Sequence, residues 1–335
     1  MSDDIAAMLV EQVTRALAEH CDASTLREVE ARRFPKQAWD ALAPIGLRLA
    51  LVPEDQGGAG LGLEAAADLF MALGRHGAPV PLAEDMVAAM LFAAGGLEVP
   101  DDGVLTFAAA GSAVPWGAFA TRVAMVHGRR LHITAGGVAN GRASISGEPR
   151  DVIEHATTLA EVTLPEAFGD DSARALTALV RAAEIAGALG AILALAVDYA
   201  NIRVQFGRPI GRFQAIQQQL AEFAEESACT SVAARSAGRA ADQRGLAGAA
   251  FEIGCAKIIA GEAAGKCAGI AHQVFAAIGI TEDHSLHHFT RRLWSWREEG
   301  GTERFWARRI GAEAQARGGA ALWPDITARD EEPSP

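Results

Sequence analysis

Three arginines lie close together in one short segment of the chain, which reads RVQFGRPIGRFQAIQ and begins at Arg203. Arg208 and Arg212 follow within nine residues, and Gly207 and Pro209 separate them. A planar guanidinium group forms paired hydrogen bonds with phosphate oxygens, so these side chains could bind an anion or a nucleotide phosphate. The alternative interpretation is a solvated basic turn between two helices.

The flanking sequence must place these arginines at a corner between two helices. An apolar helical pattern runs into the segment from Leu176, and a second helical pattern leaves it from Phe213. Gly207 can adopt the positive φ that ends a helix, and Pro209 cannot continue one. We therefore expect the first helix to end at Gly207.

Three regions are expected along the chain. Residues 1–100 have apolar residues at helical spacing, and residues 101–168 contain short β-like runs separated by Gly, Pro and Ser. Residues 169–318 contain four periodic segments, at about 171–203, 213–242, 247–278 and 284–317, which favour a four-helix bundle. These features predict a mainly α protein with a small antiparallel β domain, followed by a flexible acidic tail over residues 319–335.

Composition excludes several classes of function. The net charge of −12 over 335 residues argues against a nucleic-acid-binding protein. The four cysteines have no CxxC spacing, which favours reduced thiols rather than a zinc site or a disulfide framework. The N-terminus is acidic rather than basic, and the longest uncharged apolar run, Ile185 to Val197, is too short to span a bilayer. We expect a cytoplasmic protein that does not insert into membranes.

A histidine cluster invites a metal interpretation, which the sequence does not favour. His284, His287 and His288 have a spacing that places three imidazoles near one helix face. The HExxH pattern of zinc enzymes needs a carboxylate that is missing here. We therefore expect structural histidines and no metal.

The amino-acid sequences of three segments resemble those of the acyl-CoA dehydrogenase flavoprotein family. RVQFGRPIGRFQAIQ is similar to the family's signature, FPKQAWDALAPIGLRLALVPEDQGGAGLG to its entry helices and Pro-Glu-x-x-Gly-Gly-x-Gly loop, and HQVFAAIGITEDHSLHHFTRRLWSW to its Gln-x-x-Gly-Gly-x-Gly region. The resemblance implies an N-terminal helical domain, a middle β domain and a C-terminal four-helix bundle. It also implies FAD, an acyl-CoA substrate, an electron acceptor protein, a role in lipid metabolism and a dimer or tetramer of like or unlike chains.

The resemblance also implies which residues bind the flavin across a subunit boundary. The positions that match the family's corner for the adenosine diphosphate part of FAD are Arg203, Phe206, Ile210, Phe213 and Gln214. Further expected contacts are Gln273 and Ala277 from the partner-facing loop and Thr302 after the base position. Ala276 and Ala277 stand where the family has glycines, and their methyl groups narrow the approach of a pyrophosphate.

The catalytic base of the family has no clear counterpart. Its usual position falls on Gly300 and its other known position on Thr177. A one-residue shift of the loop would place Glu299 there, so Glu299 is the candidate base, which requires a desolvated carboxylate of raised pKa. The alternative is that Glu298 and Glu299 form a solvated helix end. Glu184, on the preceding helix, is expected to be a paired structural carboxylate.

Two functions follow from the resemblance. The first is FAD-dependent α,β-dehydrogenation of an acyl-CoA thioester. The second is a non-catalytic or half-site subunit that completes the FAD site of a partner chain in a hetero-oligomer. The second is favoured by the missing base, by the two alanines, and by the shortness of the β region. In that region only AAAGSA, from Ala108 to Ala113, weakly matches the family's Thr-Glu-x-x-Ala-Gly-Ser segment.

Overall fold

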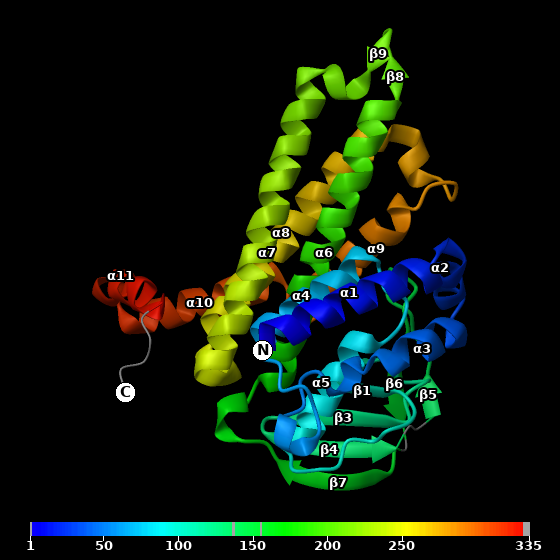
Figure 1. Ribbon diagram of the computed structural model, residues 1–335. Coiled ribbons are helices and arrows are strands. Elements are labelled where there is room, and N and C mark those ends of the chain that lie inside the picture. The colour runs from blue at the N-terminus through cyan, green and yellow to red at the C-terminus, as the bar shows by residue number, and fades with distance from the viewer. Residues whose placement is uncertain (1, 136–137, 155, 331–335) are drawn as a thin grey trace.

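The protein has three parts, which Figure 1 shows as a cluster of N-terminal helices, a small β region and a tall group of long helices. The structure is a computed structural model that describes residues 2–135, 138–154 and 156–330. One continuous apolar core joins the parts, with members as far apart in sequence as Val13, Leu131 and Trp306.

The N-terminal part is helical, as predicted. Its helices are α1 (Ser2–His20), α2 (Ala23–Glu30), α3 (Lys36–Leu42), α4 (Leu63–Arg75) and α5 (Leu82–Ala94). The start of α4 is capped from a distant helix, because the Asp242 carboxylate accepts hydrogen bonds from the backbone N–H groups of Leu63 and Glu64, at 2.6 and 2.9 Å. This cap ties the glycine-rich loop before α4 to the C-terminal bundle.

The β region forms two small sheets. Its strands are β1 (Leu105–Ala109), β2 (Val114–Pro115), β3 (Arg122–His127), β4 (Arg130–Ala135), β5 (Val138–Asn140), β6 (Arg150–Glu154) and β7 (Thr158–Thr163). One sheet has the order β1-β3-β4-β7 and the other β2-β6-β5. The expectation of a purely antiparallel domain was wrong, because β1 pairs with β3 in parallel. The residues between these strands, which include β2, cross to the other sheet and return the chain in the same direction.

The C-terminal part consists of α6 (Ser172–Ile202), α7 (Gln214–Gly248), α8 (Ala250–Phe275), α9 (Leu286–Glu298), α10 (Glu303–Arg317) and α11 (Gly319–Thr327). Helices α6 and α7 form a hairpin that projects beyond the other elements, and the two-residue strands β8 (Val204–Gln205) and β9 (Arg208–Pro209) lie at its tip (Figure 1). Contrary to prediction, α6 ends at Ile202, and Gly207, at φ +79°, serves the turn between β8 and β9 instead.

Two further expectations about the C-terminal part need correction. The fourth periodic segment is two helices, because Gly300 and Gly301 at φ +70° and +98° interrupt it between α9 and α10. The segment expected to be a flexible tail contains α11, which begins after Gly318, a residue with φ +85°. Residues 331–335 of that predicted tail lie outside the described residues.

Among the described residues, two helices are long and apolar enough to cross a membrane by length and composition alone, Ser172–Ile202 and Ala250–Ile280. The protein buries 67% and 50% of their most apolar windows against its own helices. This burial is typical of the core helices of a bundle.

Candidate functional site

Glu299 lies at the centre of a buried group of ion pairs. The loop from Glu299 to Thr302 joins α9 to α10, and Gly300 approaches α6 so closely that an added Cβ would lie 2.5 Å from the backbone nitrogen of Ala178. The Trp306 indole N–H donates to the Gly300 carbonyl at 3.0 Å, and Thr302 caps α10. These contacts fix the loop and hold the Glu299 side chain toward the β region.

Two arginines from different parts of the fold bind the Glu299 carboxylate. Arg150 of β6 donates from Nε at 2.9 Å, and Arg181 of α6 donates from Nε at 2.8 Å. Although burial alone would raise the pKa of this carboxyl, the two guanidinium groups lower it to about 2. A carboxylate of such low basicity is a poor proton acceptor at neutral pH. The raised pKa expected of a base is not found. The alternative of a solvated helix end does not hold for Glu299 either, although Glu298, the last residue of α9, is exposed.

The ion pairs continue into the interior. Arg181 also pairs with Glu184 of α6 and Glu84 of α5, and all three side chains are buried. Burial is the largest influence on the pKa of Glu184 and raises it to about 8, although Arg181 acts in the opposite direction. The sequence offered one signal for this cluster, since Arg181 and Glu184 stand three residues apart in an otherwise apolar helix. It gave no indication of Arg150.

A cavity of about 600 Å³ lies beside Glu299, between the β region, the start of α6 and the α9–α10 loop. Both positions considered for a base reach it, since Thr177 and Glu299 line it, and so do Glu298 and Thr302. The other lining residues are Phe107, Ala108, Ala109, Ser112, Ala113, Pro115, Ser144, Ile145, Arg150, Ala173, Arg174, Trp294, Ser295, Gly300, Gly301 and Phe305. The AAAGSA segment therefore contributes to the wall of this cavity.

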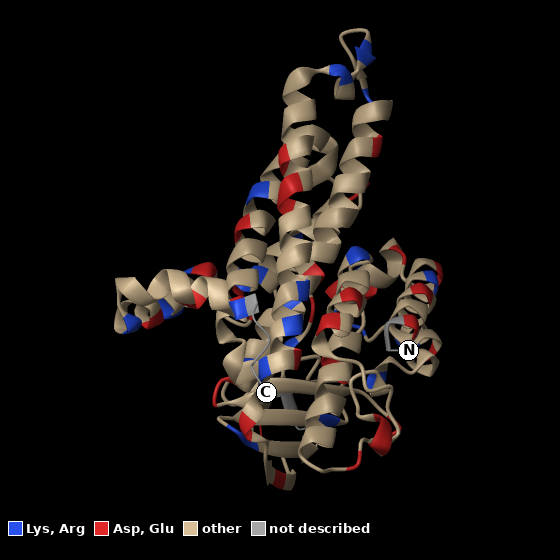
Figure 2. Ribbon diagram, turned by 60° about the vertical axis from the view of Figure 1, so that its left-hand side comes forward, with Lys and Arg blue, Asp and Glu red and all other residues tan. Residues whose placement is uncertain are grey.

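The arginine corner lies at the tip of the α6–α7 hairpin, where Figure 2 shows basic residues gathered. Within the described part of the chain, Arg203, Arg208 and Arg212 form no ion pair with a carboxylate, and Arg208 stacks over the Phe213 ring at 4.3 Å. Phe206 is 92% exposed at φ +51°, and with Gly207 it forms a two-residue hairpin turn.

The remaining predicted contacts lie near the same tip or at the end of α8. Ile210 and Phe213 are half-buried, and Gln214 begins α7, whose first turn has no side-chain cap. Gln273, in the last turn of α8, and Ala277 are exposed. Ala276 follows α8 at φ +54°, ψ −138°, a conformation that favours glycine.

The predicted residues thus form two groups at opposite ends of α6. This helix has 31 residues, which at 1.5 Å per residue is about 46 Å. Thr177 and the cavity lie near its start. The arginine corner follows its end, where Figure 1 shows β8 and β9. One dinucleotide in this cavity cannot also reach the corner of the same chain.

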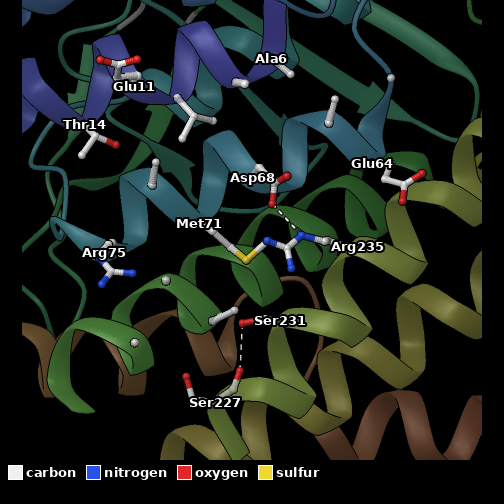
Figure 3. A pocket seen from close by; sticks show the side chains of 18 of the residues that line it. Ala6, Glu11, Thr14, Glu64, Asp68, Met71, Arg75, Ser227, Ser231 and Arg235 are labelled. Atoms are coloured by element: carbon white, nitrogen blue, oxygen red, sulfur yellow. Dashed lines mark hydrogen bonds and ion pairs between the residues drawn. The ribbon is translucent and has the colours of Figure 1, made fainter. Parts of the chain in front are cut away.

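The largest of the described cavities, about 1000 Å³, lies elsewhere, in a groove between α1, α4, α6 and α7. Figure 3 shows Arg235 paired with Asp68 inside it, the Met71 side chain beside them, and Ser227 and Ser231 on α7. None of the predicted site residues lines this groove, whereas Thr302 and Glu299 line the smaller cavity.

The histidine cluster is embedded in side-chain contacts. His288 is buried and its Nδ1 lies 2.8 Å from a Glu30 carboxylate oxygen, while His287 Nδ1 lies 2.7 Å from the His284 carbonyl oxygen. Across the described residues, no three His, Cys, Asp or Glu side chains are arranged to hold a metal ion.

Comparison with known families finds two matching domains. The family described as acyl-CoA dehydrogenase, N-terminal domain, matches residues 3–101, and the one described as acyl-CoA dehydrogenase, C-terminal domain, matches residues 174–315. These two ranges flank the β region. A curated relative, acyl-CoA dehydrogenase IpdE2 of Mycobacterium tuberculosis, is 30% identical over 295 residues, which cover 85% of this chain and 89% of the relative.

Solved structures share the fold. The Tcur3481-Tcur3483 steroid ACAD G363A variant superposes with a TM-score of 0.83 at 24% identity, covering 96% of this chain and 100% of that chain. The ChsE4-ChsE5 complex of Mycobacterium tuberculosis superposes with a TM-score of 0.80 at 25% identity, covering 92% and 96%. The predicted order of helical domain, β domain and helical bundle is confirmed by this likeness.

Proposed function

This chain belongs to the acyl-CoA dehydrogenase family, oxidoreductases acting on CH–CH bonds, and from that premise we propose that it works as a half-site subunit. In this proposal its arginine corner completes an FAD site whose larger part belongs to a neighbouring chain. The single observation that carries the proposal is that neither position considered for the base offers a basic carboxylate to the cavity. Arg150 and Arg181 hold Glu299 ionised, and the other position is Thr177.

The residues of the corner fit the adenosine diphosphate part of FAD. Arg203, Arg208 and Arg212 form no ion pair with a described carboxylate and can bind phosphate oxygens. The N–H groups of the first turn of α7 have no side-chain cap and point toward the same region, and an anion at a helix N-terminus is favourable. The exposed Phe206 ring offers a surface for stacking.

When bound, the flavin supplies the oxidant that accepts a hydride from the substrate β-carbon. The protein must remove the α-proton with a base and exclude water from the thioester. In this chain Thr177 has no basic atom, and two guanidinium groups bind the ionised Glu299 carboxylate and lower its basicity. We therefore assign proton abstraction to the partner chain, and to this chain the binding of the nucleotide.

Glu298 favours a second candidate, a complete acyl-CoA dehydrogenase. Its side chain lines the cavity, is exposed, and forms no ion pair within the described residues. In this alternative Glu298 takes the α-proton, and two copies of the chain exchange arginine corners.

We propose that the substrates of the assembly are acyl-CoA thioesters with bulky acyl groups. The assembly would pass electrons to an electron acceptor protein in the cytoplasm. Support comes from the steroid ACAD and the two-chain ChsE4-ChsE5 complex to which this chain is similar. In the half-site interpretation the acyl group lies in the partner's cavity.

The test compares the chain purified alone with the complex isolated from its native cells through a tag on this chain. We expect the chain alone to retain little FAD and to reduce no artificial electron acceptor with an acyl-CoA. The native complex should contain FAD, and Arg203→Ala should reduce its FAD content without unfolding the chain. Turnover by the chain alone that is abolished by Glu298→Gln would instead establish the second candidate.

A further inference from the structure

Three rings join the end of α6 to the end of α8 and the start of α9. The Tyr199 ring of α6 stacks on the Phe275 ring of α8, with ring centres 4.6 Å apart and an angle of 28° between the planes. The His284 ring, which lies just before α9, has its centre 4.5 Å from that of Phe275. Phe275 is buried. We call Tyr199, Phe275 and His284 the aromatic stack.

The backbone connects Tyr199 directly to the arginine corner. The Arg203 N–H donates to the Tyr199 carbonyl oxygen at 2.8 Å, and the Ile210 N–H donates to the Arg203 carbonyl oxygen at 2.8 Å. Gly211 lies against the last turn of α6, where an added Cβ would be 3.2 Å from the Ala200 carbonyl oxygen. The position of Tyr199 therefore determines where the corner begins and how it returns toward α7.

The aromatic stack also holds the loop that follows α8, which Figure 1 shows in orange beside the α6–α7 hairpin. Gly279 of this loop lies so close to Phe275 that an added Cβ would be 2.8 Å from the Phe275 Cβ. The Nδ1 atom of His284 accepts a hydrogen bond from the backbone N–H of the first residue of α9, at 3.1 Å. Gln273 and Ala277, two of the predicted flavin contacts, thus lie two residues from a ring that is fixed against α6.

The corner has little packing of its own. Ile202, Val204 and Phe206 are 79%, 54% and 92% exposed, and none of residues 201–213 is buried. On the α7 side the first buried residue is Phe223. A segment without buried side chains opens easily unless its ends are fixed. The aromatic stack, at the end of α6, is therefore the nearest fixed support of the corner.

We propose that Tyr199 is a positioning residue for the nucleotide. Its ring, held against Phe275, keeps Arg203 and Gln273 at the spacing that binds the adenosine diphosphate part of FAD. This inference rests on the proposed function, because it assigns a support to the same corner. A binding surface that is formed in advance loses less conformational freedom when the ligand binds. Within the described part of the chain the Tyr199 hydroxyl forms no hydrogen bond, so the ring is the part that acts.

Hydrogen exchange in the chain alone tests the support without any flavin. Tyr199→Leu removes the ring but keeps an apolar side chain, whereas Tyr199→Phe keeps the ring. We expect the backbone amides of residues 203–213 to exchange about tenfold faster in Tyr199→Leu and at the native rate in Tyr199→Phe.

Phe34→Leu is the matched control for the exchange measurement. The Phe34 ring is also half-buried and packs on another ring, with the Phe119 centre at 5.2 Å, but it lies in the N-terminal part. This variant should leave the amides of residues 203–213 unchanged. Equal exchange rates in Phe34→Leu and Tyr199→Leu would overturn the proposal.

A fluorine label reports on the stack itself. Tyr199 is the only tyrosine of the chain, so incorporation of fluorotyrosine gives a single fluorine resonance. Phe275→Leu should shift this resonance, because the neighbouring ring is lost, and Phe34→Leu should not. A resonance that Phe275→Leu leaves in place would show that the two rings are not stacked, and would contradict the proposed support.

Release of FAD from the native complex connects the support to function. Followed by the rise of flavin fluorescence after dilution, FAD should leave the Tyr199→Leu complex about tenfold faster, with Tyr199→Phe and Phe34→Leu unchanged. If Arg203→Ala speeds the release and Tyr199→Leu does not, the proposed function stands and the positioning role fails. If Arg203→Ala leaves the release unchanged, the proposed function itself fails, and the flavin role of Tyr199 with it.

Discussion

Glu299 receives hydrogen bonds from arginines of two different parts of the fold, Arg150 of β6 and Arg181 of α6. A buried carboxylate with such partners stays ionised, because each guanidinium favours the charged form. Removing one member of a buried ion pair leaves its partner uncompensated, which costs more than the pair itself contributes. Glu299 therefore matters to the stability of the chain, whatever its part in chemistry.

Replacing Glu299 tests this role. Glu299→Gln should lower the free energy of unfolding by about 3 kcal/mol, because Arg150 and Arg181 lose their shared counter-charge. Glu298→Gln is the matched control, since Glu298 is exposed, and should change the free energy by less than about 0.5 kcal/mol. Urea denaturation measures both, and equal effects of the two variants would show that the ion pairs around Glu299 are dispensable.

Replacing Ala276 should raise the free energy of unfolding rather than lower it. Its φ of +54° and ψ of −138° are costly for any residue with a Cβ, and the side chain is exposed. Ala276→Gly should raise the free energy of unfolding by about 1 kcal/mol, because the relief of strain exceeds the greater freedom of glycine in the unfolded chain. Thermal unfolding of the two proteins measures the change, and a less stable variant would contradict the strained conformation.

At the scale of elements, the α9–α10 loop holds Glu299 in place. Gly300 combines a positive φ with contact against the backbone of α6, so two separate constraints exclude a side chain there. Gly46 has a positive φ, +84°, without any neighbour within 4 Å of an added Cβ. Alanine substitutions at Gly300 and Gly46 therefore separate the free-energy cost of a positive φ from the cost of the steric contact with α6.

We expect Gly300→Ala to destabilise the protein by at least about 2 kcal/mol more than Gly46→Ala does. The Gly46 variant carries only the conformational cost of about 1 to 2 kcal/mol, whereas the Gly300 variant must also displace α6 or the loop. Chemical denaturation of both variants gives the difference. Similar losses in the two would mean that the loop can move away from Ala178.

Helix positions were well predicted from sequence, but connections between elements were not. The apolar periodicity placed the cores of α6, α7 and α8 to within a few residues, apart from the end of α7, because such periodicity follows directly from which face is buried. It missed the break at Gly300 and Gly301, since the residues on both sides keep helical spacing. The partners of Glu299 could not be found, because Arg150 lies 149 residues away and its strand gives no local sign of them.

At the scale of the whole molecule, the buried ion pairs connect the three parts of the fold. Glu84 belongs to an N-terminal helix, Arg150 to the β region, and Arg181 and Glu299 to the C-terminal part. The stability of the whole chain should therefore depend on pH through this group. Glu299, with its lowered pKa, contributes stability that is present above pH 4.5 and is lost as the pH falls toward about 2.

Glu184 acts in the opposite direction. Its folded pKa of about 8 lies above the ordinary value of 4.5, so the folded state holds an extra proton between these values. The free energy of unfolding should fall as the pH rises through this window. Glu184→Gln, which stays neutral, should flatten the fall, as measured by urea denaturation at several pH values. An unchanged slope in the variant would assign the pH dependence to other groups.

The length of α6 has a consequence for how this protein can evolve. Because the cavity and the arginine corner lie at its two ends, the length of the helix fixes the distance between them. In the proposed half-site assembly, this length also fixes the distance between neighbouring subunits. Inserting or deleting one turn would move the corner by about 5 Å and rotate it around the helix axis. Lineages that share this assembly should therefore tolerate changes of length in their loops but keep this helix at a constant number of residues.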